Sequence, residues 1–312
     1  MINQLVGNYK RLKQEIGKVI VGQHGAVDHV LLSVLCGGHS LLIGVPGLAK
    51  TLLVNTVAKA LGLNFKRIQF TPDLMPSDIL GSEILDENRH FKFIKGPIFA
   101  NIILADEINR TPPKTQAALL EAMQEKSVTV AGHHFDLELP FFVLATQNPI
   151  EQEGTYPLPE AQLDRFMFSI YLDYPSFDEE VFVAKNTTND EEERVNPVFS
   201  ASDILEYQHL IRRIPIADNV VEYAVRLASK TRPGRKESPE LVNNYLDWGA
   251  GPRASQNLVL AAKAYAAIRG KFSPDIEDVQ AVAYGILHHR IVRNYKAEAE
   301  GISERDIIKT LL

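Results

Sequence analysis

The sequence predicts an α/β protein with a parallel β-sheet, followed by a smaller, all-helical domain. Three observations carry this prediction. Short apolar segments alternate with helix-like segments from about residue 20 to residue 175, a pattern typical of parallel strands covered by helices on both faces. The strand pattern stops beyond this point, and from Ser200 onward apolar residues repeat with helical spacing. We therefore expect a core at residues 1–180, a linker at 181–199 and a helical domain at 200–312.

Five segments are candidate buried strands of the predicted sheet. Residues 51–61, directly after the first candidate and a glycine-rich turn, place their apolar side chains on one helical stripe. The sequence thus predicts a strand, a turn and a helix in direct succession. The five candidates are Ser40–Val45, Phe65–Phe70, Asn101–Asp106, Phe141–Thr146 and Phe166–Leu172.

Two further segments alternate apolar and polar residues, and we expect them to form β-hairpins inserted into the core. Ile79–Phe93 contains the polar turn Asp86-Glu87-Asn88-Arg89, and Val128–Leu139 alternates around Gly132. From these residues alone, each hairpin could equally be a decoration of the surface.

Helix signals continue to the end of the chain. Ser273-Pro274 predicts a helix start, and Ser303 with Asp306 resembles a capping box. The acidic run Asp190–Glu193 predicts a solvated loop. Two apolar stripes are expected on the first helices of this part: Ile204, Tyr207, Ile211 and Ile214, then Val221, Ala224, Val225 and Ala228.

Composition narrows the class of protein. Because 33 Lys and Arg face 39 Asp and Glu, the net charge of −6 argues against bulk binding of nucleic acid. The longest apolar runs, Val30–Cys36 and Pro140–Ala145, are shorter than the roughly 20 residues of a membrane-spanning helix. Residues 1–20 lack the apolar core of a signal peptide. A single cysteine, Cys36, excludes an internal disulfide and a cysteine-based zinc site. We expect a cytoplasmic protein without membrane insertion.

The strongest chemical signal is the loop Gly44-Val45-Pro46-Gly47-Leu48-Ala49-Lys50-Thr51, between a predicted strand and a predicted helix. Main-chain N–H groups in such a turn surround phosphates, and the helix N-terminus adds a favourable dipole. Lys50 would reach the β- and γ-phosphates, and the Thr51 hydroxyl would ligate Mg²⁺. Ala49 replaces the glycine usual before the lysine. Alanine costs little there if its dihedral angles are helical, but it is strained if φ is positive.

Polar residues end two other predicted strands. Asp106 could hold Mg²⁺, and Glu107 could act as general base toward the attacking water. Asn148 would project from the same edge of the sheet, where ligands of open α/β sheets bind. The alternatives are a strand that runs into an acidic turn, and an ordinary Asn-Pro turn.

Two arginines could add positive charge to a phosphate site. Arg165 precedes the last predicted strand, and Arg253 begins a predicted helix in the second domain. A guanidinium near the γ-phosphate lowers the barrier to phosphoryl transfer. Each arginine could instead be a surface ion-pair residue.

Neither pair of adjacent histidines, His133-His134 or His288-His289, can chelate one metal ion alone. Neighbouring side chains point to opposite faces of a strand and lie about 100° apart on a helix. We expect solvated or hydrogen-bonded histidines.

Together these residues resemble the AAA+ ATPases over nearly the whole chain. The two hairpins are similar to the helix-2 insert and pre-sensor hairpin of the clade that contains magnesium chelatase and MCM helicases. Thr71–Gly81, Gly154–Phe166 and the loop with Ala49 resemble the MoxR family within that clade.

The resemblance implies a role for each site residue. The loop from Gly44 to Thr51 becomes Walker A, Asp106 and Glu107 become Walker B, and Asn148 becomes sensor 1. Arg165 becomes the arginine finger presented to a neighbouring subunit, and Arg253 becomes sensor 2 in a helical lid. Val21-Gly22-Gln23 matches the segment against the adenine. Gly251 departs from the family, where serine is frequent before Pro-Arg.

The family also implies ATP and Mg²⁺ as cofactors and ring homo-oligomers, often hexamers. ATP turnover in such rings remodels or matures a client protein, frequently one with a von Willebrand factor A domain. Two alternatives remain open. One is a nucleotide-gated binding module with incidental hydrolysis, and the other is a nucleic-acid motor, which the net charge disfavours.

Overall fold

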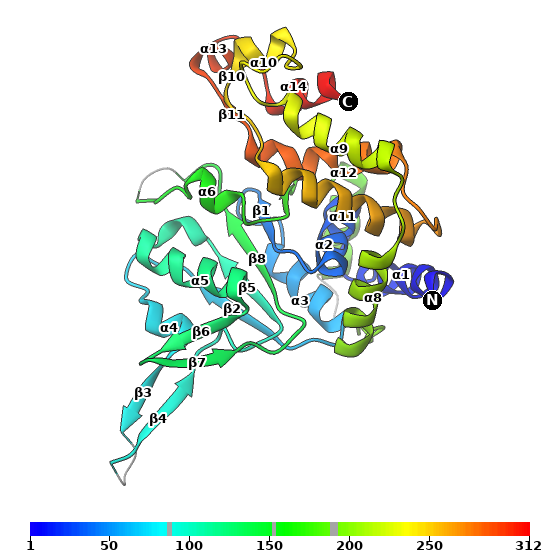
Figure 1. Cartoon of the computed structure of the whole chain (residues 1–312). Coiled ribbons are helices and arrows are strands. Elements are labelled where there is room, and N and C mark those ends of the chain that lie inside the picture. Colours follow the sequence, from blue (N-terminus) through cyan, green and yellow to red (C-terminus); the bar gives the residue numbers. More distant parts are fainter. Residues whose placement is uncertain (86–88, 152–153, 188–192) are drawn as a thin grey trace.

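A five-stranded parallel sheet forms the centre of the α/β core in the computed structural model, which describes residues 1–85, 89–151, 154–187 and 193–312 (Figure 1). The strand order is β2-β5-β8-β1-β9. All five candidate strands are confirmed, four with shorter bounds and β8 shifted by one residue: β1 (Ser40–Ile43), β2 (Phe65–Gln69), β5 (Ile102–Asp106), β8 (Phe142–Gln147) and β9 (Phe168–Tyr171).

Helices cover both faces of this sheet. Neighbouring residues of one strand show the two faces, because Ile103 and Leu104 of β5 belong to different apolar clusters. The cluster around Leu104 includes α1 (Ile2–Gly17), α2 (His24–Cys36) and α3 (Lys50–Ala60). The cluster around Ile103 includes α4 (Pro76–Leu80) and α5 (Pro113–Glu125).

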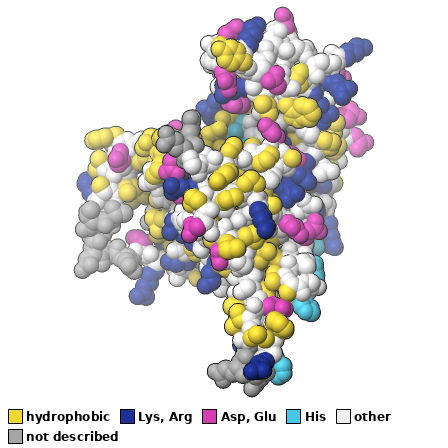
Figure 2. All heavy atoms as spheres, turned by 90° about the vertical axis from the view of Figure 1, so that its left-hand side faces the viewer, with side chains coloured by type: hydrophobic (Ala, Val, Ile, Leu, Met, Phe, Trp, Pro, Cys, Tyr) yellow, Lys and Arg dark blue, Asp and Glu magenta, His cyan; other side chains and the backbone are white. Residues whose placement is uncertain are grey.

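The two expected hairpins are confirmed with shifted bounds, since residues 79 and 80 belong to α4, and they pack against each other. They are β3 (Gly81–Leu85) with β4 (Phe91–Lys95), and β6 (Ser127–Val130) with β7 (His133–Asp136). Phe93 and Phe135 stack with their ring centroids 4.2 Å apart, which joins the hairpins. In Figure 1 the β3–β4 hairpin projects from the body, and Figure 2 shows apolar side chains exposed along it. Phe91 of β4 is 74% exposed. The expected turn residues 86–88 lie outside the described residues.

The remainder of the chain is mainly helical. Short helices α6 (Glu160–Leu163), η1 (Ile108–Arg110) and η2 (His288–Arg290) connect larger elements. The others are α7 (Phe177–Thr187), α8 (Ala201–Arg213), α9 (Asp218–Lys230), α10 (Glu240–Tyr245), α11 (Pro252–Ile268), α12 (Ile276–Leu287), α13 (Tyr295–Ala299) and α14 (Glu304–Leu311). Helix α7 crosses residue 180, and residues 190–192 of the acidic run lie outside the described part of the chain.

Several local expectations need correction. A short antiparallel pair, β10 (Leu246–Trp248) with β11 (Val292–Arg293), lies in the helical part, because strands this short leave no periodic signal. On α9 the buried stripe is centred on Val220 and Leu227, while Val225 is 48% exposed.

Of the two expected helix starts near the end of the chain, one needs correction and the other is confirmed. Helix α12 starts two residues after Ser273-Pro274, because the Asp275 carboxylate accepts a hydrogen bond from the Asp278 N–H and so caps it. The capping box of Ser303 and Asp306 is confirmed at α14.

Within the described ranges, none of the helices combines the length and the apolar character needed to cross a membrane.

Candidate functional site

The glycine-rich loop joins β1 to α3 and leaves its main-chain donors free. Gly47 has a φ of 89° and Ala49 a φ of 53°, so both lie in the left-handed region. Among the described residues, the N–H groups of residues 47–52 donate to no protein acceptor. Gly44 closes the turn tightly, since a Cβ there would lie 3.0 Å from Cβ of Leu172. This cradle of free amides at a helix N-terminus fits a chain of phosphates.

A cavity of about 430 Å³ collects most of the expected site residues. It is lined by residues 46–52 together with Asp106, Glu107 and Asn148. These residues end or follow β1, β5 and β8, which are neighbours in the sheet, and parallel strands end at one edge. The Thr51 hydroxyl and the Asp106 carboxylate are oxygen donors of the kind that Mg²⁺ prefers.

Lys50 lies between the loop and the acidic pair. Its Nζ donates a hydrogen bond to the Gly44 carbonyl oxygen. Burial lowers the pKa of the Lys50 ammonium, whereas Asp106, Glu107 and Glu151 act to raise it. The ammonium thus sits in a partly dry, negatively charged site.

Hydrogen bonds hold Asp106 and Glu107 in place. The Thr146 hydroxyl donates to Oδ1 of Asp106 at 2.7 Å and accepts the Glu107 N–H at 2.8 Å. Oδ2 of Asp106 accepts from Arg67, with Nη2 at 2.7 Å and Nε at 3.0 Å. Oε2 of Glu107 accepts from Gln69 at 2.8 Å and from Arg110 at 3.2 Å.

Sequence reasoning missed Arg67, Gln69 and Arg110. A signal existed for the first two, because they alternate on the edge strand β2 and so share one face. Asn148, which was expected, is 5% exposed, and its Oδ1 accepts the Ile150 N–H at 3.2 Å.

A smaller, mostly apolar cavity of about 150 Å³ adjoins the loop and shares Gly47, Leu48, Ala49 and Leu52 with the first. Val21 and Gln23 line it, and Gln23 donates to the Asp173 carbonyl oxygen at 2.7 Å. The other lining residues come mainly from the segment before α2 and from α7. Gly22 is not among them and lies against the Glu179 carboxylate. An apolar slot beside a phosphate loop suits a purine base.

Neither Arg165 nor Arg253 lines the loop cavity. Arg165 follows α6 and is half-buried. Nη1 of Arg253 donates to Oδ2 of Asp164 at 3.0 Å, with the arginine side chain 42% exposed. Within one chain, neither arginine is therefore part of the loop cavity.

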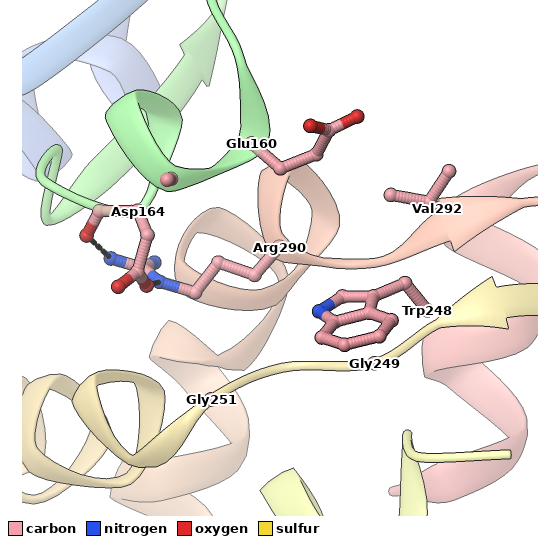
Figure 3. A pocket seen from close by; sticks show the side chains of 8 residues that line it. Glu160, Asp164, Trp248, Gly249, Gly251, Arg290 and Val292 are labelled. Carbon is pink, nitrogen blue, oxygen red and sulfur yellow. Dashed lines mark hydrogen bonds and ion pairs between the residues drawn. The ribbon is translucent and has the colours of Figure 1, made fainter.

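Asp164 also pairs with Arg290, a residue that sequence reasoning missed. Nε of Arg290 donates to Oδ1 of Asp164 at 2.8 Å, and the arginine side chain is 1% exposed. A cavity of about 500 Å³ opens beside this pair, between α6 and β10–β11, with the Trp248 indole facing it (Figure 3). It is larger than the loop cavity but contains no residue of the loop.

The adjacent histidines contact oxygen atoms of the protein. His134 Nε2 lies 3.3 Å from an oxygen of Asp136. His288 Nδ1 lies 2.8 Å from the Tyr284 carbonyl oxygen, and His289 Nε2 lies 3.1 Å from that of Phe166. In the part of the chain that the structure describes, no three His, Cys, Asp or Glu side chains gather as a metal site.

Comparisons with known proteins agree with this geometry. Residues 39–168 match the family model described as "ATPase family associated with various cellular activities (AAA)", and residues 239–311 match the AAA lid domain. The chain is 44% identical to YeaC of Bacillus subtilis, over 96% of this chain and 91% of that protein. It is 43% identical to Chaperone MoxR1 of Mycobacterium tuberculosis, over 96% of this chain and 79% of that protein.

A crystal structure from Cytophaga hutchinsonii, described as a candidate ATPase, superimposes with a TM-score of 0.93. It is 47% identical and covers 99% of this chain and 94% of that one. With the sheet, the helical lid and these relatives taken together, the chain belongs to the MoxR family of AAA+ ATPases, which are nucleotide-binding proteins.

Proposed function

We propose that the chain is a Mg²⁺-dependent ATPase that works in a ring-shaped homo-oligomer, with a hexamer expected, to remodel or mature a client protein. The observation that carries the proposal is the loop cavity, where a cradle of free amides meets Asp106, Glu107 and Asn148. A client with a von Willebrand factor A domain is the family's expectation, as is a cytoplasmic location.

Each residue has a separate task in this proposal. The N–H groups of residues 47–52 and the Lys50 ammonium bind the phosphates, while Val21, Gly22 and Gln23 lie on the side of the base. Thr51 and Asp106 hold the metal ion, which neutralises phosphate charge when it is bound. Glu107 accepts a proton from the attacking water at a carboxylate oxygen, and Asn148 orients that water. Arg165 reaches a neighbouring subunit, and Arg253 moves with the lid.

The core at 1–180, the linker at 181–199 and the lid at 200–312 remain a proposed division. The match of the lid model to residues 239–311 and of the AAA model to residues 39–168 supports it.

Two substitutions test binding and hydrolysis separately. Lys50→Ala removes the only side-chain cation that lines the loop cavity among the described residues, so nucleotide binding should be lost. Glu107→Gln keeps the shape of the base but not its basicity, so ATP should bind without turnover. Binding is measured with a fluorescent ATP analogue, and turnover by phosphate release.

Glu125→Gln, an exposed acid at the end of α5, is the matched control and should behave like the unchanged protein. Normal turnover by Glu107→Gln would contradict the assigned base. Binding without any turnover by the unchanged protein would favour the nucleotide-gated module instead. Proteins that co-purify with the Glu107→Gln form would identify the client.

A further inference from the structure

Arg67 holds the carboxylate that is proposed to receive the metal ion. Strand β2 runs beside β5 with Gln69 opposite Asp106, and this register brings Arg67 within reach of the end of β5. Both Nε and Nη2 of Arg67 donate to the same oxygen, Oδ2 of Asp106, at 3.0 Å and 2.7 Å. The Asp106 side chain is 13% exposed and that of Arg67 is 46% exposed. The guanidinium thus reaches from the surface to a mostly buried acid.

The guanidinium of Arg67 also contacts Gln69, which bonds to Glu107, the proposed general base. Nη2 of Arg67 donates to Oε1 of Gln69. Because the amide oxygen of Gln69 is engaged in this way, its amide nitrogen is left to donate to Oε2 of Glu107, at 2.8 Å. An unbroken chain of hydrogen bonds therefore runs from Asp106 through Arg67 and Gln69 to Glu107.

We propose that Arg67 is a positioning residue that acts as the counter-cation of Asp106 and couples metal binding at Asp106 to the placement of Glu107. This inference rests on the proposed function. One carboxylate oxygen that accepts two N–H groups has little capacity left for a divalent ion, and the two cations repel each other. A metal ion that took Oδ2 as a ligand would loosen the hold of Arg67 on that oxygen, and Gln69 would transmit the change to Glu107.

The other cations near the acidic pair do not serve this purpose. Lys50 bonds to the Gly44 carbonyl, and Arg110 contacts Glu107 but makes no bond to Asp106 among the described residues. Lys66 is the neighbour of Arg67 on β2, is also exposed, and points to the opposite face of the strand. It offers a matched control, because its removal changes the net charge equally without touching Asp106.

The test is direct titration of Mn²⁺ onto the full chain with a non-hydrolysable ATP analogue, followed by electron paramagnetic resonance of free Mn²⁺. Arg67→Met removes the competing cation and should tighten Mn²⁺ binding about three- to fivefold, the range that a partly exposed ion pair supports. Lys66→Met should change it by less than about half of that. In an Asp106→Asn background, Arg67→Met should lose its effect.

Turnover supplies a second measurement that moves in the opposite direction. Arg67→Met should lower kcat even though it binds the metal more tightly, because Glu107 loses the orientation that Gln69 gives it. Mere loss of folded protein would weaken both. If Arg67→Met does not fold, Arg67→Gln replaces it in both measurements, because glutamine keeps a polar end group but removes the positive charge.

Four results would overturn the inference. Weaker Mn²⁺ binding by Arg67→Met, or binding equal to that of Lys66→Met, would contradict it and leave the proposed ATPase intact. An effect of Arg67→Met that persists in the Asp106→Asn background would place its cause elsewhere. If the unchanged protein binds no metal–nucleotide complex at all, the inference and the proposed function both fail.

Discussion

Ala49 occupies a backbone conformation that alanine disfavours. Its φ of 53° and ψ of 30° are left-handed, directly before the first residue of α3. The left-handed region costs an L-residue about 1–2 kcal/mol, whereas glycine adopts it freely. The strain lies at the centre of the proposed phosphate loop, where it fixes the direction of the following amides.

Replacing Ala49 by glycine should therefore stabilise the protein. The relief of strain exceeds the about 0.4–1 kcal/mol that the freer unfolded chain costs, so a net gain of about 0.5–1 kcal/mol is expected. Chemical denaturation measures it, and nucleotide binding should persist because no polar side chain of the loop is lost.

Ala131 is the control for the backbone effect. Its φ is 49°, but it lies in the turn between β6 and β7, away from the loop. Ala131→Gly should give a similar gain with unchanged nucleotide binding. Destabilisation by Ala49→Gly together with a gain from Ala131→Gly would show that the methyl group of Ala49 makes a stabilising contact.

At the scale of single residues, the sequence predicted site residues wherever a polar residue stands at the end of an apolar strand. Asp106, Glu107 and Asn148 were predictable because each follows an apolar strand, and parallel strands end together. The alternation of Arg67 and Gln69 was visible in the sequence, but their partners were not, because these depend on the register of β2 against β5. The sequence also left the sign of φ at Ala49 open, because the folded loop and not the residue type sets that angle.

Arg290 connects two elements that are far apart in the sequence. All five of its N–H groups find acceptors. Nε donates to the Asp164 carboxylate, and the two terminal nitrogens donate to the carbonyl oxygens of Asp164, Phe166, Met167 and Ile286. Burial lowers the pKa of Arg290 to about 10, although Asp164 acts to raise it. The short helix η2 is thereby held against the segment between α6 and β9.

Arg290→Met should destabilise the protein by about 3 kcal/mol, because it leaves several buried carbonyl oxygens without donors. Arg253→Met is the matched control. Arg253 pairs with the other oxygen of the same carboxylate but is 42% exposed, so its loss should cost less than about 1 kcal/mol. Equal losses in thermal denaturation would mean that the buried network contributes nothing beyond an ordinary surface ion pair.

Helices and strands were predicted best where their periodic pattern of apolar residues extended over many positions. The β-hairpins could be found by alternation, but their mutual packing through Phe93 and Phe135 could not, because no pattern links side chains 42 positions apart (135 − 93). The pair β10–β11 was not predicted because its strands are too short to show a periodic pattern.

On the scale of the whole molecule, the N-terminal helices and the C-terminal helices form one apolar cluster. Helices α1 and α2 contact α11, and α2 also contacts α8 (Figure 1). The amphipathic pattern of α1 shows that one face is buried, and Leu5, Tyr9 and Leu12 are indeed buried. The pattern does not identify the partner, which is set by long-range packing.

Two buried histidines, His39 and His288, and the partly exposed His289 should make the folded state sensitive to acid. Burial lowers the pKa of His39 and of His288 to about 4 and lowers that of His289 well below its usual value. These rings are neutral in the folded state and take up protons on unfolding. Their stabilisation is complete above the unfolded pKa of about 6.5 and is lost as the pH falls toward 4, at about 1.4 kcal/mol per unit of pKa difference.

The expected result is a steady fall in the free energy of unfolding between pH 6.5 and pH 4. His288→Phe keeps the stacking on Tyr284, where the ring centroids are 4.8 Å apart, and should reduce the slope. The exposed His134 is the control, so His134→Gln should leave the slope unchanged. A flat profile over this range in the unchanged protein would mean that these histidines are accessible to protons in the folded state.

A ring in which each subunit completes its neighbour's site makes a prediction about mixtures. Arg165 does not line the loop cavity of its own chain, so Arg165→Ala should bind ATP but not hydrolyse it. Lys50→Ala should bind none, yet its Arg165 is intact. Mixing the two inactive proteins should restore part of the turnover, because some subunits with an intact loop will lie beside a subunit with an intact arginine. Phosphate release, measured across a series of mixing ratios, should peak at intermediate ratios. Zero activity at every ratio, with mixed oligomers demonstrated by light scattering and cross-linking, would show that Arg165 does not act between subunits.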